Sequence, residues 1–449
     1  MEKNVEGCLG GGKTEIKSEK LTALSDAVEH LYHFRDHYFE NHNIEDAPKK
    51  TEEVRKKLTE ILKLFEENKD VEPKERAQYF YLKGHALNIM PTFDPKAEEA
   101  LSRAIKLDVK MYDAWNELGE CYWKKEDICE AKNCFLGALK QCRNKKSLRN
   151  LSIVLRIEKP ENIKERMKNV EEGVKYAKEA VEMDTTDGTS WSVLGNAYLS
   201  SFFTLNQAPS ILNLCKTAYA QAEKDVIAKS NPDLHYNKAI VAKYDEEYLL
   251  ALNSFAQASR LEPSWQEPRV KKRQLLDYLS KIQELSKDKG KMKGKKLSKM
   301  LGNLNPGKNL GPYKDGVYKA KNGQEIKLVH INFNALKEGL NEEKVILGVV
   351  VCSVQNEDCV PFTFVMVDQN EESIVVTVYN LAEGKGVLIG DYVAVPEPYL
   401  SNVKISFENK DYTFNSVRVV SPLVMVVNGK KLDKSKHSRL QLSTFTVSD

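Results

Sequence analysis

Three charged residues have types and positions that could bind a peptide. Arg156 follows the apolar run SLRNLSIVL, Asp233 lies in SNPDLHYNKA, and Glu267 lies in EPSWQEPR. One cation and two anions on a common surface suit a ligand with adjacent opposite charges, because like charges brought together are penalised. Each residue is equally compatible with a solvated surface charge, so the pattern alone leaves both interpretations open.

A run of lysines is the second candidate for binding. The stretch KDKGKMKGKKLSK, residues 287 to 299, holds seven lysines and one aspartate. Its glycines and charge are typical of a solvated tether between domains. The alternative is electrostatic docking on the phosphate backbone of DNA or RNA without sequence readout, because the run contains no aromatic residue that could stack on a base.

Three histidines near the amino end have a spacing compatible with a metal ion. His30, His33 and His37 recur at i, i+3 and i+7, which places them on one face of a helix. No cluster of carboxylates or thiols accompanies them, and the residues between them are ordinary polar surface types. We therefore expect solvated histidines and no metal site.

Motifs of enzymatic chemistry are missing from the sequence. There is no G-x-S-x-G, H-E-x-x-H or dinucleotide fingerprint. The phrase GCLGGGKTE, residues 7 to 15, superficially matches the G-x-x-x-x-G-K-[ST] spacing of a phosphate-binding loop, but no strand pattern precedes it, so we do not interpret it as one. We expect a protein that acts by binding and is not an enzyme, with no cofactor and no small-molecule substrate.

The cysteines do not form a recognisable framework. They lack the paired C-x-x-C spacing of a zinc site or of a disulfide scaffold. Those between 121 and 142 have no histidine nearby, and we interpret them as small packing residues of a helical hairpin. The eight are Cys8, Cys121, Cys129, Cys134, Cys142, Cys215, Cys352 and Cys359.

The elements that must position these residues follow a 34-residue repeat. The pattern W-x2-L-G-x2-Y followed by A-x3-F is the tetratricopeptide signature, in which each unit is a pair of helices. It is carried between 115 and 139 by Trp115, Leu118, Gly119, Tyr122, Ala131, Phe135 and Ala138. It recurs at Ala97, Leu101 and Ala104, at Trp191, Leu194, Gly195 and Tyr198, and at Ala251, Phe255 and Ala258.

The repeat predicts an all-α solenoid over residues 21 to 288, with five or six hairpins. Surplus residues at 156 to 173 and 201 to 215 indicate longer helices or loops there, which an array tolerates because each unit contacts only its neighbours. The amphipathic stretch 268 to 287 is predicted to be a C-terminal cap helix. The first helices of successive hairpins should line a concave groove, and the Lys and Asn clamp that grips a terminal carboxylate is not found at its expected positions.

From about residue 343 the pattern changes from helical to strand-like. Short β-branched and aromatic runs between turn residues predict five or six strands, and a hairpin turning at Asn409 and Lys410. These features favour an OB-fold-like barrel over residues 343 to 430. Residues 287 to 300 would then be a basic linker and 301 to 342 a connecting segment. Residues 1 to 20 and 431 to 449 are expected to be disordered.

The predicted barrel carries aromatic residues that could stack on bases. They are Phe362, Phe364, Tyr379, Tyr392, Phe407, Tyr412 and Phe414. Residues 301 to 449 nevertheless hold 16 basic and 17 acidic side chains, so the barrel has no general attraction for a phosphate backbone. We therefore favour a protein-docking or structural module over a nucleic-acid binder.

Composition limits the classes of protein to which the chain can belong. The 449 residues include 41% apolar residues, and 68 basic side chains nearly balance 65 acidic ones. A net charge of +3 predicts no general affinity for nucleic acid or acidic membranes. The amino end lacks the apolar segment of a secretory signal, and no run approaches a membrane span. We expect a soluble, intracellular protein of two or three domains.

The longer phrases are more specific than the repeat signature. CRNKKSLRNLSIVLR, SNPDLHYNKA, LEPSWQEPR and KGKMKGKKLSKMLG, followed by PFTF and GVLIGDYVAVPEP, resemble the tetratricopeptide repeat protein 5 family over residues 24 to 430. The resemblance implies a repeat array joined to a C-terminal OB-fold, in the cytoplasm and the nucleus.

Two activities follow from the resemblance. In the first, the groove reads the N-terminal Met-Arg-Glu-Ile or Met-Arg-Glu-Cys peptide of nascent tubulin on translating ribosomes, and decay of tubulin messenger RNA follows. In the second, the protein is a nuclear scaffold for a histone acetyltransferase in the p53 stress response.

The resemblance also assigns roles to single residues. It pairs Arg156 with the glutamate of the tubulin peptide and places Asp233 and Glu267 near its arginine. It assigns Lys293 and Lys295 to ribosomal RNA, a contact that the charge of the run independently allows.

Overall fold

The chain divides into two compact units, which are described separately. The structure is a computed structural model, and it describes residues 18–158, 160–205, 207–319, 323, 325–357, 360–382 and 384–437. The first unit runs to Pro268 and the second begins at Arg269. Most of the predicted disordered ends, including Cys8 and the phrase at 7 to 15, lie outside the described residues, as does Cys359.

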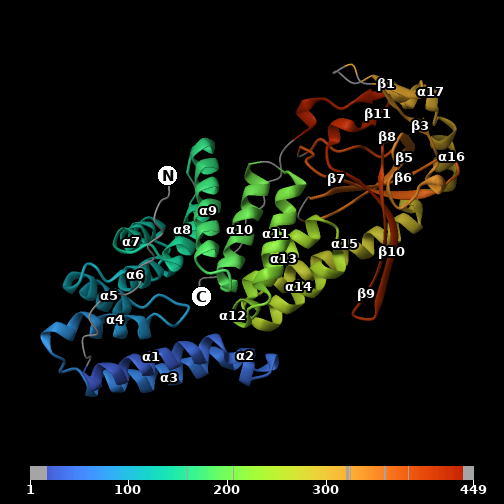
Figure 1. Cartoon of the computed structure of the whole chain (residues 1–449). Helices are drawn as coiled ribbons and strands as arrows, with labels where there is room; N and C mark the ends of the chain where they lie inside the picture. Colours follow the sequence, from blue (N-terminus) through green and yellow to red (C-terminus); the bar gives the residue numbers. More distant parts are fainter. Residues whose placement is uncertain are drawn as a thin grey trace. The chain divides into compact units, whose positions relative to one another are not determined.

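The first unit is built from helices (Figure 1). It opens with α1 (Glu19–Asp36), α2 (Tyr38–Asn41), a 3₁₀ turn η1 (Ile44–Asp46) and α3 (Ala47–Glu67). The helices that follow are α4 (Arg76–Leu87), α5 (Pro95–Leu107), α6 (Tyr112–Lys124), α7 (Ile128–Gln141), α8 (Lys145–Ile157), α9 (Ile163–Met183), α10 (Gly188–Thr204), α11 (Pro209–Ala222), α12 (Val226–Lys229), α13 (Pro232–Tyr244) and α14 (Tyr248–Leu261).

The repeat signature explains how the helices pair. In the hairpin of α6 and α7, a Cβ atom added at Gly119 would lie 2.5 Å from Cε1 of Phe135, and Phe135 is fully buried. Gly84 lies against Leu101 and Gly195 against Tyr219 in the same way in two other hairpins. The glycine therefore lets a large side chain of the second helix pack against the first, so the tetratricopeptide solenoid is confirmed.

The surplus over the 34-residue period lies mainly in longer helices. Helix α9 has 21 residues, whereas α5 has 13 and α7 and α14 have 14 each. Helix α10 extends to 17 residues, of which 13 are buried. The extra turns therefore lengthen a hairpin without breaking the array, as expected for units that contact only their neighbours.

The first hairpin reaches the last one inside the first unit. Helices α1 and α3 share a core in which Leu24, Leu31 and Phe65 are at most 1% exposed. Glu45, in the turn between α2 and α3, forms an ion pair of 3.2 Å with Arg260 of α14. The array therefore curls back far enough for its two ends to line common cavities.

The second unit contains a ten-stranded sheet with the order β12-β11-β8-β5-β6-β7-β10-β9-β4, and β3 beside β5. Strands β10 and β7 are parallel, and every other pair on this path is antiparallel. The strands are β3 (Val329–His330), β4 (Gly339–Leu340), β5 (Lys344–Val354), β6 (Phe362–Val367), β7 (Ser373–Val378), β8 (Tyr392–Pro396), β9 (Tyr399–Phe407), β10 (Lys410–Val419), β11 (Val426–Val427) and β12 (Lys430–Lys431).

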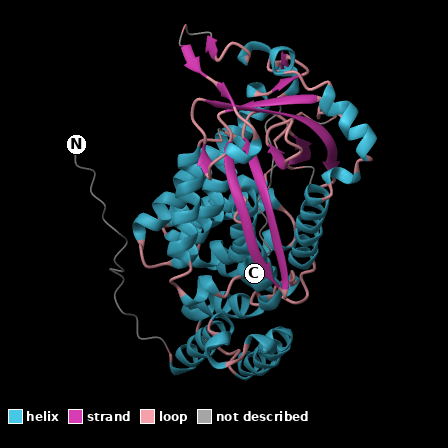
Figure 2. Cartoon of the chain, turned by 90° about the vertical axis from the view of Figure 1, so that its right-hand side faces the viewer, coloured by secondary structure: helices cyan, strands magenta, loops and turns pink. Residues whose placement is uncertain are grey.

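The predicted strand runs coincide with observed strands, and β5 matches its run at both ends. The hairpin of β9 and β10, seen as two long neighbouring arrows in Figure 2, turns at Glu408 and Asn409 rather than one residue later. Both turn residues have positive φ, 48° and 62°, as a two-residue type I′ loop requires.

Helix α15 (Glu267–Lys287) groups with the sheet, not with the repeats that we expected it to cap. The Tyr278 and Thr363 hydroxyls are 2.7 Å apart, and Gln283 accepts a bond of 2.6 Å from the backbone N–H of Thr413. Its buried positions include Leu275 and Ile282. The amphipathic pattern predicted a buried face, but periodicity does not specify the partner of that face.

The basic stretch 287 to 300, expected to be a solvated linker, is folded onto the second unit. It contains a 3₁₀ turn η3 (Lys289–Lys291) and enters α16 (Gly294–Gly302). Gly290 has a φ of 67°, and a Cβ atom there would lie 2.9 Å from Cβ of Cys352. Leu297 is 6% exposed, so the apolar residues among the lysines anchor the segment.

Other boundaries also differ from the expectation. The connecting segment 301 to 342 contains α17 (Pro306–Asn309) and a separate hairpin of β1 (Val317–Lys319) and β2 (Glu325–Lys327), as well as β3 and β4. Beyond residue 430, Leu381 bridges to His437, so part of the predicted disordered tail belongs to this unit. Among the described residues, no helix is both long and apolar enough to cross a membrane.

Candidate functional site

A groove of about 440 Å³ is enclosed by the first helices of successive hairpins, with α1 facing them. Helix α8 supplies the largest share of its lining, and α6, α10 and α13 supply most of the remainder. The charged residues that line it are Arg35, Asp36, Glu120, Lys124, Lys145, Lys146, Arg149, Asp187 and Asp233. A groove with this many charges of both signs suits a polar, extended ligand.

Most cations of the groove already have an acidic partner. Lys146 contacts Glu117 at 2.5 Å and Glu120 at 3.1 Å. Arg149 contacts Asp187, which also caps α10 through the backbone N–H of Thr189. These pairs help to fix the walls of the groove, because a cation that turns toward a ligand gives up a charged partner.

Glu117 of α6 is buried and is contacted by several polar groups. Burial acts to raise its pKa, but His85 and Lys146 outweigh burial and hold the pKa well below its ordinary value. Asn88 donates a further bond of 2.9 Å to the carboxylate. The ring of His85 stacks on Tyr32 of α1 with centroids 3.9 Å apart, so the same cluster ties the first hairpin to the repeats.

Arg156 is not among the residues that line this groove. It follows Arg149 and Ile153 at i+7 and i+3 on α8, so it continues the face that does line the groove. Its Nη1 donates a bond of 2.8 Å to Ser152, whereas Nε and Nη2 are inaccessible to solvent and have no hydrogen-bond partner among the described residues.

The charge of Arg156 is not balanced by its neighbours. Burial lowers the pKa of its guanidinium to about 10, against an opposing contribution from Tyr219. Burial also raises the pKa of the Tyr219 phenol well above its ordinary value, so the phenol is neutral. Its hydroxyl donates a hydrogen bond of 2.7 Å to Oδ1 of Asn196. Arg156 is therefore a buried cation with unused donors.

The two predicted acids have different surroundings. Asp233 lines the groove and is 3% exposed, at the start of α13, where Asn231 accepts its backbone N–H at 2.8 Å. Glu267 begins α15, is partly exposed, and does not line the groove. The structure thus brings Asp233 into the groove, whereas neither Arg156 nor Glu267 lines it.

Sequence reasoning missed the cations of α8. We expected no cationic clamp, but Lys145, Lys146 and Arg149 all line the groove. The period alone could not have found Arg149, because it follows Trp115 by 34 residues and Trp115 packs within its own hairpin and does not line the groove.

The lysines predicted to dock on RNA lie in the second unit. Lys293 immediately precedes α16 and Lys295 lies in its first turn, and both are exposed. Lys296 and Lys299 are exposed on the same helix, whereas Leu297 and Leu301 are buried. Packing of the leucines therefore presents a row of lysines to solvent.

The other candidate residues have ordinary surroundings. The rings of His33 and His37 stack with centroids 4.2 Å apart, and the described residues hold no cluster of three metal-ligating side chains. Cys134 and Cys215 are buried, and burial raises the pKa of each to about 12, so both thiols are protonated packing groups.

The aromatic residues of the barrel are mostly inaccessible. Phe364, Tyr379, Tyr412 and Phe414 are at most 6% exposed, and Phe362 packs against the same core as Phe364. The hydroxyl of Tyr392 donates to the backbone of α16. Since stacking on a base requires an exposed ring face, these positions do not form a platform for nucleic acid.

Comparisons with known proteins agree with both units. Residues 327–441 match the family model described as "Tetratricopeptide repeat protein 5 OB fold domain". The chain is 48% identical to the bovine protein named "Tetratricopeptide repeat protein 5" over 94% of this chain and 96% of the relative. The human protein of that name is 48% identical over 93% and 95%, and the mouse protein is 47% identical over the same shares. The chain therefore belongs to the tetratricopeptide repeat protein 5 family, whose repeat array and OB-fold make it a protein-interaction adaptor.

Proposed function

We propose that this adaptor reads the N-terminal peptide of nascent tubulin on translating ribosomes and promotes decay of tubulin messenger RNA. The observation that carries the proposal is the buried guanidinium of Arg156, in which Nε and Nη2 have no partner in the part of the chain that the structure describes. A buried charge is costly unless it is paired, so a site of this kind is complete only when a ligand supplies the anion. The glutamate of a Met-Arg-Glu peptide supplies that carboxylate.

The position of Arg156 on α8 supports contact with a ligand in the groove. Its one hydrogen bond, to Ser152, joins it to a neutral hydroxyl and is worth about 1 kcal/mol, whereas a bidentate pair with a carboxylate is stronger. Arg149 and Ile153, on the same face, already line the groove. Binding therefore requires the side chain of Arg156 to leave Ser152 and turn toward this face.

Asp233 supports the opposite charge in the ligand. It is 3% exposed at the wall of the groove, so a cationic side chain that approaches it is attracted with little screening by solvent. A ligand with an arginine beside a glutamate therefore matches Asp233 and Arg156 in sign. Glu267 stays a weaker assignment, since it does not line the groove.

Titration of a synthetic peptide that begins Met-Arg-Glu-Ile tests the proposal. Arg156→Ala is expected to weaken binding at least thirtyfold, because truncating one partner of a buried charge pair costs about 2 kcal/mol or more. The peptide affinity of Arg156→Lys is expected to lie between those of the unchanged chain and Arg156→Ala, since lysine keeps the charge and loses the planar guanidinium. Isothermal titration calorimetry measures all three.

A matched control removes an arginine outside the groove. Arg143 precedes α8, pairs with Glu179 and is 54% exposed. Arg143→Ala should bind the peptide as the unchanged chain does, because an exposed ion pair contributes little. Equal affinities of Arg156→Ala and Arg143→Ala would remove the basis of the assignment.

A further inference from the structure

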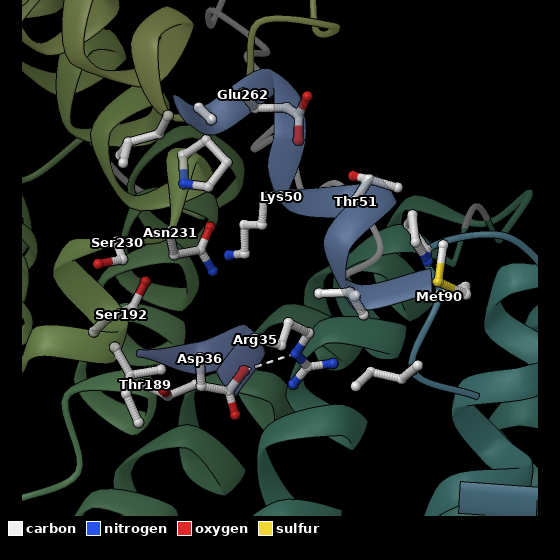
Figure 3. Close-up of a pocket in the computed structure, with 18 residues that line it drawn as sticks. Arg35, Asp36, Lys50, Thr51, Met90, Thr189, Ser192, Ser230, Asn231 and Glu262 are labelled. Carbon is white, nitrogen blue, oxygen red and sulfur yellow. Dashed lines mark hydrogen bonds and ion pairs between the residues drawn. The ribbon is translucent and has the colours of Figure 1, made fainter. Parts of the chain in front are cut away.

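A second cavity, of about 190 Å³, opens beside the groove within the first unit. Figure 3 shows the first hairpin on one side of it, with Arg35 and Asp36 from α1 and Lys50 and Thr51 from α3. Residues of α10, α12 and α13 and the end of α14 face them. The cavity is larger than the ~150 Å³ apolar hole that admits a benzene ring, so it has room for one large side chain.

The wall of this cavity is mainly apolar. Val54, Ile89 and Met90 lie on the side of the first hairpin and the neighbouring turn, and Ile227, Ala228 and Leu261 lie on the opposite side. Five of these six side chains are at most partly exposed, whereas Ile227, on α12, is 38% exposed. An isoleucine left open to water at the mouth of a cavity favours an apolar occupant.

The charges at the cavity balance one another. Arg35 and Asp36 are bonded to each other at 2.7 Å, as the dashed line in Figure 3 shows. Lys50 and Glu262 add one more charge of each sign to the lining. With no net charge to neutralise, the site is suited to an uncharged side chain.

The cavity and the groove are continuous. Arg35, Asp36, Thr189, Ser192, Ile227 and Asn231 line both of them. Asn231 caps α13 and bonds to the backbone of Asp233, so Asp233 is the groove acid next to the cavity. One ligand can therefore occupy both spaces, and the part that enters the cavity adjoins the part held at Asp233.

We propose that this cavity receives a large unbranched or aliphatic side chain from the ligand residue adjoining the one at Asp233. The inference rests on the proposed function, in which Asp233 faces the ligand's arginine and Arg156 its glutamate. That order directs the peptide from the cavity past Asp233 toward Arg156. The occupant of the cavity is then the residue before the arginine, which is the initiator methionine of the tubulin peptide.

Peptides that differ only at residue 1 test the cavity directly. Norleucine keeps the shape of methionine and should bind within about twofold, whereas glycine should bind at least tenfold more weakly, because burial of a methionine side chain is lost. A glycine peptide that binds as tightly as the methionine peptide would overturn the inference. This comparison uses the unchanged chain and does not depend on the folding of a variant.

Two neighbouring residues of α12 provide a matched pair of protein variants. Ile227 lines the cavity, whereas Val226 does not, and both are exposed, at 38% and 47%. Ile227→Asp should weaken the methionine peptide by a factor at least threefold larger than its effect on the glycine peptide, because Ile227 lines the groove as well as the cavity. Val226→Asp should alter neither, and circular dichroism should show the same helix content in both. Equal losses in the two variants would contradict the cavity assignment.

The outcomes separate this inference from the proposed function. Binding that requires Arg156 but is indifferent to residue 1 of the peptide overturns the cavity alone. No binding of any of the peptides to the unchanged chain overturns both.

Discussion

Arg156 is a costly residue at its position. Its guanidinium is shielded from solvent, two of its nitrogens have no hydrogen-bond partner within the described ranges, and burial keeps the pKa of the adjacent Tyr219 high, so that the phenol is neutral. Sequence alone could identify Arg156 as a charge after an apolar run, but its burial depends on α9, the next helix, and on Tyr219 of α11, about 60 residues later. Residues retained at a cost in stability are expected where a ligand later supplies the missing partner.

The cost of Arg156 predicts a gain in stability when its charge is removed. Arg156→Met keeps much of the apolar stem and removes the uncompensated cation, so the free energy of unfolding should rise by about 1 kcal/mol or more. In a unit of this size that corresponds to a rise in Tm of about 2–4 °C.

Differential scanning calorimetry measures the change, and Arg143→Met is the control, expected within ±0.5 kcal/mol of the unchanged chain because Arg143 is an exposed site. A lower Tm for Arg156→Met would show that contacts in the free protein already stabilise the guanidinium, so that it does not need a ligand to supply a partner.

At the level of elements, periodicity predicted much of the fold. The spacing of Trp115, Gly119 and Phe135 predicted both the paired helices and their close contact, because these residues act within one hairpin. The run KVILGVVVCSV predicted β5 in full. Local patterns of this kind are sufficient where the partner of an element is its neighbour in sequence.

The partners of distant elements could not be predicted in this way. Nothing in the sequence of α15 indicates that Gln283 would bind the backbone of Thr413, about 130 residues later. Likewise the glycines and lysines of 287 to 300 are typical of a tether, whereas Gly290 is needed because a side chain there would meet Cys352. The residues that line the groove also come from helices far apart in sequence, so only their register could be anticipated.

The folded lysine segment predicts a contact that is separable from peptide binding. Lys293→Glu with Lys295→Glu reverses two exposed charges on α16 and should abolish cosedimentation with ribosomes, while the affinity for the free Met-Arg-Glu-Ile peptide stays unchanged. The control, Lys404→Glu with Lys434→Glu, makes the same change in charge at exposed sites elsewhere in the second unit. Loss of ribosome binding in both pairs would indicate a nonspecific effect of net charge.

At the level of the whole molecule, the two units carry different candidate binding surfaces. The repeat unit holds the groove, Arg156 and the adjoining cavity, and the second unit holds the lysines of α16 and a sheet whose aromatic residues are largely buried. Under the proposed function, a target that presents a peptide and a phosphate surface together should bind more tightly than either alone, because each contact adds to the effective concentration of the other.

Recovery of ribosomes that translate β-tubulin is the measurement that tests this account most directly. The unchanged full-length chain should recover them, and Arg156→Ala should recover none above the level of ribosomes translating an unrelated protein, while it still folds and still carries the α16 lysines. Recovery by Arg156→Ala equal to that of the unchanged chain would contradict the claim that a buried, unpaired guanidinium reads the nascent peptide.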